Sequence, residues 1–131
     1  MVVEFASVDR QQLVSLALPH PASEDPILVS ISRPALELVE RSVSCIYIEI
    51  AEFAQEICGL SDDWAGKLSF SSLEDDFVVL CRSRSEESAT LEFILEASED
   101  EGGVVTTAAF EVPIVAIQKI ATDVATHVKQ C

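Results

Sequence analysis

The chain has few basic residues and almost no histidine. Eight Lys and Arg stand against 23 Asp and Glu, which gives a formal net charge of −15 over 131 residues. The two histidines, His20 and His127, have no cysteine or carboxylate at the spacing of metal ligands, so we expect no zinc site. The negative electrostatic field of such a protein repels nucleic acid and membrane surfaces and speeds encounter with a basic partner. The same charge can instead serve only to raise solubility.

The cysteines lack a metal-binding or disulfide-scaffold pattern. There are four, with no C-x-x-C pair: Cys45 and Cys81 lie in apolar runs, Cys58 follows Ile57, and Cys131 is terminal. We therefore expect free thiols, the first three buried. The N-terminus does not look like a secretory signal, and no apolar run approaches the roughly 18 residues of a membrane span. The expected compartment is the cytoplasm.

No catalytic motif is present. The chain contains no G-x-S-x-G, P-loop or dinucleotide fingerprint, and no segment fits an EF-hand. Its carboxylates gather in predicted turns, whereas a carboxylate-dependent enzyme needs them on rigid elements that converge in a cleft. We expect a protein that is not an enzyme and that has no cofactor or metal, with a carboxylate enzyme as an open alternative.

The hydrophobic pattern predicts an α+β fold. Its length favours one domain, residues 1–131. It indicates an antiparallel β-sheet of about 7–8 strands with two helices packed on one face, in the order strands, helix, four strands, helix. The predicted strands are two within 2–18 and then 27–32, 36–50, 66–72, 77–82, 90–96 and 104–110, and the predicted helices are 50–58 and the segment from Pro113 to 128. The halves share a loose strands-then-helix order without a convincing sequence repeat.

Acidic residues supply the candidate partner-binding site. In the predicted strand 90–96, Glu92 and Glu96 share the outer face, and turns at both ends add further acids, which predicts a continuous acidic wall. Turn acids elsewhere are candidates too, although solvated turn residues explain each cluster equally well. Trp64 is either a core residue or an interface anchor. The candidates are Glu92, Glu96, Glu99, Asp100, Glu101, Asp62, Asp63, Trp64, Glu74, Asp75 and Asp76.

A sequence of elements in the second part of the chain carries a family resemblance. A short helix at 50–58 leads to Trp64-Ala-Gly66, then a strand and an acidic turn at 68–77, a strand at 90–95 and a terminal amphipathic helix. Over roughly residues 43–128 this pattern resembles the small bacterial immunity proteins of the WapI type. The resemblance implies a single immunity-protein-like domain, cytoplasmic, that binds and blocks the domain of a secreted or contact-dependent toxin.

The charge is consistent with that implication, because toxin nucleases present basic surfaces to phosphate backbones. The partner expected from the resemblance is therefore a basic toxin domain. An adaptor, chaperone or structural subunit that binds a protein client through a sheet edge or an apolar groove is the alternative. The oligomeric state and the identity of the toxin are left open by the sequence.

Overall fold

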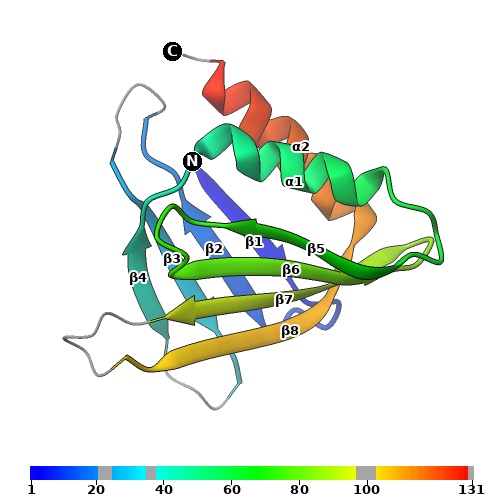
Figure 1. The fold of residues 1–131 in the computed structure, drawn as a ribbon, viewed down its shortest axis with the longest axis horizontal. Coiled ribbons are helices and arrows are strands. Elements are labelled where there is room, and N and C mark those ends of the chain that lie inside the picture. Colours follow the sequence, from blue (N-terminus) through cyan, green and yellow to red (C-terminus); the bar gives the residue numbers. More distant parts are fainter. Residues whose placement is uncertain (21–24, 35–37, 97–102, 130–131) are drawn as a thin grey trace.

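Within the described residues, eight strands and two helices form two halves with the same order of elements. The computed structural model describes residues 1–20, 25–34, 38–96 and 103–129. Each half consists of four strands followed by one helix (Figure 1). In order, the elements are β1 (Val2–Ala6), β2 (Leu13–Ala17), β3 (Ile27–Ser32), β4 (Val39–Val43), α1 (Tyr47–Cys58), β5 (Ala65–Ser71), β6 (Phe77–Arg84), β7 (Ser88–Glu96), β8 (Val105–Pro113) and α2 (Ile114–Val128).

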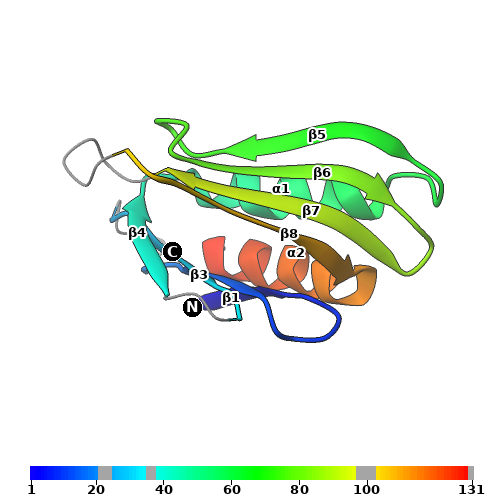
Figure 2. The same cartoon turned by 90° about the horizontal axis from the view of Figure 1, so that it is seen from below.

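The strands build two antiparallel sheets, so the α+β class is confirmed and the single large sheet is wrong. The first sheet has the order β1-β2-β3-β4 and the second the order β5-β6-β7-β8. Consecutive strands within a half pair with each other in antiparallel fashion, as in a meander. Between β4 and β5 the chain instead passes through α1, which carries it to the other layer. Figure 2 shows the two sheets as separate layers.

The helices pack on each other along one side of the molecule and not on one face of a single sheet. Helix α1 contacts α2 and the edge strand β5, and α2 contacts α1, β8 and the edge strand β1. In Figures 1 and 2 the two helices lie side by side at that side of the two layers. This placement follows from the presence of two sheets, because each sheet leaves an edge strand beside the helix of the other half.

The predicted strand 36–50 ends earlier than its alternation suggested. Strand β4 stops at Val43 and α1 begins at Tyr47, whose hydroxyl donates a hydrogen bond to the Asp25 carbonyl (2.7 Å). Apolar residues alternate on both faces of the segment 43–50, a pattern that is typical of a central strand. In the structure β4 is instead an edge strand that pairs only with β3 within the described residues, and Ile46 and Ile48 are exposed.

The two halves repeat each other with an offset of 67 residues in the helices. The buried residues of α1 at positions 50, 53, 54 and 57 correspond to buried residues of α2 at positions 117, 120, 121 and 124. In each helix these positions form the 3.6-residue stripe that faces the core. The structure therefore contains the internal repeat that the sequence indicated only as a shared order of elements.

One hydrophobic core connects the two sheets. Phe93 of β7 lies 5.3 Å, between ring centroids, from Phe5 of β1 and 5.3 Å from Phe110 of β8. Phe93 is fully buried, and residues of both sheets and both helices belong to the same buried cluster. Ring pairs at this separation stabilise a core beyond the area that they bury. The aromatic contacts therefore join the first sheet to the second.

Candidate functional site

The structure places the described partner-binding candidates at the two ends of β5 and on β7. Asp62, Asp63 and Trp64 precede β5, whereas the acids at 74–76 form the turn after it. Seven residues of β5 separate these groups by roughly 23 Å, at about 3.3 Å per residue. Glu96 of β7 lies beside the second group, since its N–H donates to the Asp76 carbonyl (2.8 Å), and Glu92 lies further along β7. Asp62, Asp63 and Trp64 are therefore separate from the second group, and Glu99, Asp100 and Glu101 fall outside the described residues.

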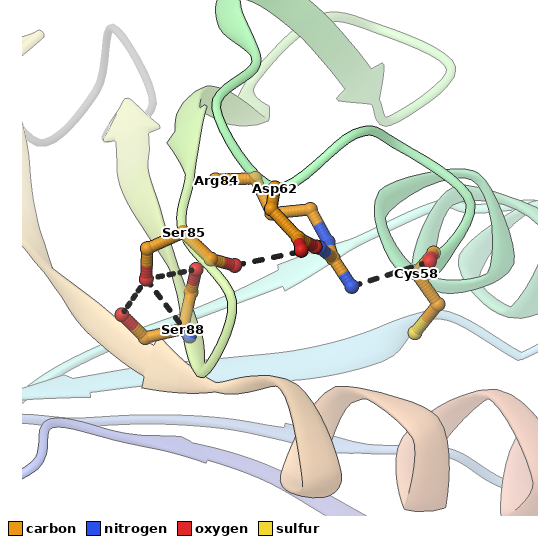
Figure 3. Close-up of polar contacts among 5 residues, drawn as sticks. All are labelled: Cys58, Asp62, Arg84, Ser85 and Ser88. Atoms are coloured by element: carbon orange, nitrogen blue, oxygen red, sulfur yellow. Dashed lines mark hydrogen bonds and ion pairs between the residues drawn. The ribbon is translucent and has the colours of Figure 1, made fainter.

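Asp62 is held by an internal arginine. Arg84 Nη1 lies 2.7 Å from Asp62 Oδ1, and Arg84 Nη2 donates to the Cys58 carbonyl at the end of α1 (3.4 Å) (Figure 3). The neighbouring turn is closed by hydrogen bonds between Ser85 and Ser88. A cation at the carboxyl end of a helix is stabilised by the helix dipole. Asp62 therefore helps to fix the connection between α1 and β5.

Trp64 packs against the core from this same connection. It is half-buried, and a Cβ built on Gly66 would lie only 3.0 Å from its ring atom Cζ2. The W-x-G pattern thus has a local physical reason, because glycine leaves room for the indole beside β5. This position supports the core-packing interpretation of Trp64.

The acidic turn between β5 and β6 contains one structural carboxylate and two exposed ones. Asp76 is 9% exposed, accepts a hydrogen bond from the Ser72 hydroxyl and pairs with Arg41 of β4 at 3.3 Å. Glu74 and Asp75 are exposed, and Asp75 has a φ of 58° in the left-handed region that Asp tolerates. Asp76 therefore stabilises the fold, which leaves Glu74 and Asp75 as surface candidates.

The outer face of the second sheet is mixed and not a continuous acidic wall. The predicted alternation of β7 is confirmed, with Leu91, Phe93 and Leu95 buried on the inner face. On the outer face, however, Glu92 pairs with Arg82 (3.6 Å) and lies between Leu80 and Ala109 in the ladder. Strands on both sides of β7 contribute apolar and neutral residues to this face, which the sequence of β7 alone did not reveal.

The structure also forms an acidic groove that the predicted site omitted. It lies between α1 and β5, has a volume of about 220 Å³, and is lined by Glu49, Glu52, Phe53, Glu56, Ser69, Phe70 and Ser71. The three glutamates are exposed, and none of them forms an ion pair within the described part of the chain. Their positions off the apolar stripe of the helix were visible in the sequence. Only the fold placed the edge of β5 opposite them.

Three thiols and one histidine have defined surroundings within the described residues. Cys45, Cys58 and Cys81 are free, as predicted, but only Cys81 is fully buried, whereas Cys45 and Cys58 are half-buried. Burial raises the pKa of each thiol, that of Cys45 to about 12 with further contributions from Asp76 and Glu49. Cys131 lies outside the described residues. His127 Nε2 is 2.9 Å from the Pro19 carbonyl. Residues 1–20, 25–34, 38–96 and 103–129 contain no group of three or more His, Cys, Asp or Glu that could hold a metal ion.

Comparisons with known proteins add no family to these observations. No family model matches the chain, and no curated protein or solved structure is significantly similar to it. Within the described residues, no helix is long and apolar enough to cross a membrane. Conclusions about function therefore depend on the charge, the groove and the pattern of residues described above.

Proposed function

We propose that this protein binds a basic protein partner and has no catalytic role. The main support is the acidic row of α1, in which Glu49, Glu52 and Glu56 line a groove and form no ion pair in the described part of the chain. Four of the eight Lys and Arg residues are already occupied by internal ion pairs. The negative field of the unpaired acids raises the association rate of a basic partner and favours it over neutral or acidic proteins.

The particular role that we propose is that of a cytoplasmic immunity protein, which blocks a toxin domain by covering its basic surface. The resemblance over roughly residues 43–128 supports this role, and the net charge of −15 suits a nuclease as the target. In this proposal inhibition is steric and electrostatic, so the protein needs no cofactor. Glu74, Asp75, Glu92 and Glu96 remain candidate partner contacts outside the groove.

An adaptor or chaperone is the second candidate, and the edge of β5 supports it. Ser69 and Ser71 of this edge strand are exposed beside the groove. Exposed sheet edges bind extended client segments through main-chain hydrogen bonds. The two candidates share a mode of binding and differ in the consequence, because an immunity protein abolishes the activity of its partner and an adaptor leaves it intact.

The experiment is a capture with the tagged full chain at low and high salt, followed by binding of the purified partner. We expect a basic protein that binds directly in calorimetry and whose affinity falls as salt rises. Loss of the partner's enzymatic activity in the complex supports the immunity role, and retained activity supports the adaptor. A purified partner that is neutral or acidic, or an affinity that does not change with salt, contradicts the proposal.

A further inference from the structure

The edge of β5 that faces away from β6 presents the backbone groups of Ser69 and Ser71, which form no hydrogen bond with any described residue. Ser72 N–H donates to the Phe77 carbonyl (2.9 Å), which fixes the register of the β5–β6 hairpin. In an antiparallel pair, the N–H and C=O groups of successive residues point alternately toward the partner strand and away from it. Ser69 and Ser71 therefore direct both groups outward.

The chain itself already forms one hydrogen bond at the neighbouring position of this edge. Leu73 N–H, two residues beyond Ser71 and on the same side, donates to the Ser44 carbonyl (2.8 Å). Ser44 belongs to the irregular segment before α1, and that segment turns into the helix at Tyr47. The pairing thus stops after one hydrogen bond, and the next outward groups belong to Ser71 and Ser69.

Two other edge positions, in the first part of β5 and on β8, carry features that usually prevent strand addition. In the first part of β5 the register shifts between Ala65 and Leu68, and Lys67 is exposed. On β8, the carbonyl of Thr107 accepts a hydrogen bond from Arg33 (2.6 Å). Bulges, lysines and capping groups all hinder the addition of a strand. Ser69 and Ser71 have small side chains, and the stretch from Ser69 to Ser71 has none of these features.

The opposite wall of the groove determines the chemistry of the occupant. Glu49, Glu52 and Glu56 extend over about 10 Å of helix, at about 1.5 Å per residue. Side chains on one face of an extended chain recur at roughly 7 Å. The row therefore matches two basic side chains at positions i and i+2 of a bound strand, above a floor that includes Phe53 and Phe70.

The repeat supplies a matched groove that lacks this acidic row. Between α2 and β1, positions 116, 119, 120 and 123 replace positions 49, 52, 53 and 56, with the same offset of 67 residues. There Ala116 stands in place of Glu49, and Lys119 pairs with Asp123 (2.7 Å). The groove is similar in volume, about 240 Å³, but its helix wall carries one cation and one anion that neutralise each other.

We propose that the groove between α1 and β5 binds an extended segment of the partner that carries lysine or arginine at alternate positions. The segment adds to β5 as a further strand, hydrogen-bonded to Ser69 and Ser71, with its basic side chains on Glu49, Glu52 and Glu56. This proposal rests on the proposed function and names the contact region of the basic partner. A second copy of this chain is disfavoured as the occupant, because at −15 each copy repels the other.

The test uses a labelled seven-residue peptide that alternates lysine and threonine, titrated against the full chain by fluorescence anisotropy and by amide NMR. We expect saturable binding, with slower hydrogen exchange at the amides of Ser69 and Ser71. The same peptide with N-methyl groups on alternate backbone nitrogens keeps its charge but loses strand pairing, and we expect it to bind about tenfold more weakly. Equal affinity of the two peptides, or unchanged exchange at both amides, overturns strand addition.

Two variants of equal charge locate the site. E52A/E56A removes two acids from the proposed groove, and E4A/D123A removes two acids from the α2–β1 groove. We expect E52A/E56A to bind the lysine–threonine peptide about fivefold more weakly than wild type, and E4A/D123A to bind it with nearly unchanged affinity. Equal losses in both overturn the assignment to the α1–β5 groove. Dimerisation through Ser69 and Ser71, detected by light scattering and exchange, also overturns it.

Failure of this inference is distinguishable from failure of the proposed function. If a purified basic partner binds wild type and E52A/E56A equally, the proposed function stands and the groove assignment is overturned. If the peptide binds at Ser69 and Ser71 but the purified partner is acidic or insensitive to salt, the groove assignment stands and the proposed function is overturned.

Discussion

Arg41 and Asp76 connect the two sheets across a distance of 3.3 Å between Nη2 and Oδ2. Arg41 belongs to β4, the last strand of the first sheet, and Asp76 to the turn between β5 and β6 of the second. Both side chains are largely buried, and Asp76 also accepts a hydrogen bond from the Ser72 hydroxyl. Of the three acids in the turn at 74–76, Asp76 therefore stabilises the fold.

We expect D76N to destabilise the protein by about 2 kcal/mol, because it leaves the buried Arg41 guanidinium without its anionic partner. Urea unfolding followed by circular dichroism measures the loss. The adjacent D75N is the control, since Asn adopts a φ of 58° readily and the residue is exposed. It should remain within about 0.5 kcal/mol of wild type. Equal effects of the two substitutions would contradict the structural role of Asp76.

We expect G66A to displace the indole of Trp64, since the new Cβ would meet ring atom Cζ2 at 3.0 Å. Because Trp64 is the only tryptophan, its fluorescence reports the change directly, as a shift of emission to longer wavelength. The cost in stability should be about 1 kcal/mol. G59A is the matched control, because its Cβ would lie 3.6 Å from the nearest atoms and should leave the spectrum unchanged. An unshifted G66A spectrum would refute this packing.

We expect F93A to destabilise the protein by about 3–5 kcal/mol, because the ring is fully buried between Phe5 and Phe110. Since those contacts span both sheets, urea unfolding should remain a single transition at a lower midpoint. Substitution of Leu73, which is 64% exposed, by alanine is the control and should have little effect. Two separate transitions in F93A would show that the sheets unfold independently.

We expect Cys45 to react with iodoacetamide at pH 8 far more slowly in the folded protein than in guanidinium chloride. Burial, with Asp76 and Glu49, raises the pKa of its thiol from 9.0 to about 12, and the thiolate is the reactive form. Because the folded-state pKa lies above the unfolded value, the associated stability is complete below pH 9 and declines as pH rises from 9 toward 12. Mass spectrometry of tryptic peptides measures the rates. Equal rates in both states would contradict the raised pKa.

We expect E92K/E96K to leave the fold intact and to slow association with the basic partner. Glu92 pairs with an exposed arginine, an interaction that contributes little to stability. Charges outside the direct contact alter the association rate, whereas charges within it alter dissociation as well. Surface plasmon resonance separates the two rates, and E52K/E56K is the comparison. Faster dissociation of E92K/E96K than of E52K/E56K would place the main contact on the outer face of the second sheet.

The strands of the second half were predictable because their patterns are local. Buried Leu91, Phe93 and Leu95 alternate with outward residues in β7, and short turns separate β5 from β6 and β6 from β7. The start of α1 was not predictable to the residue, since Ile46 and Ile48 continue an apolar pattern although they are exposed. An apolar side chain at the surface and one in the core have the same identity in a sequence, and only the neighbours differ.

The candidate site was also predictable from the sequence only in part. That acids face solvent on β7 follows from its alternation, but the pairing of Glu92 with Arg82 depends on the neighbouring strand. The burial of Asp76 depends on Arg41, which lies 35 positions earlier and in the other sheet. The helical periodicity of the sequence places the glutamates of α1 outside its apolar stripe. The sequence does not reveal that the edge of β5 lies across from them.

The sequence by itself determined the charge, the free cysteines in the described residues, the α+β class and the order of the elements, because these depend on composition and on periodicity within short segments. Tertiary structure decided that the strands divide into two sheets, that the helices pack together beside β1 and β5, and which carboxylates remain unpaired. These outcomes depend on contacts between residues far apart in the chain. Their geometry is set by the packing of both halves around one core.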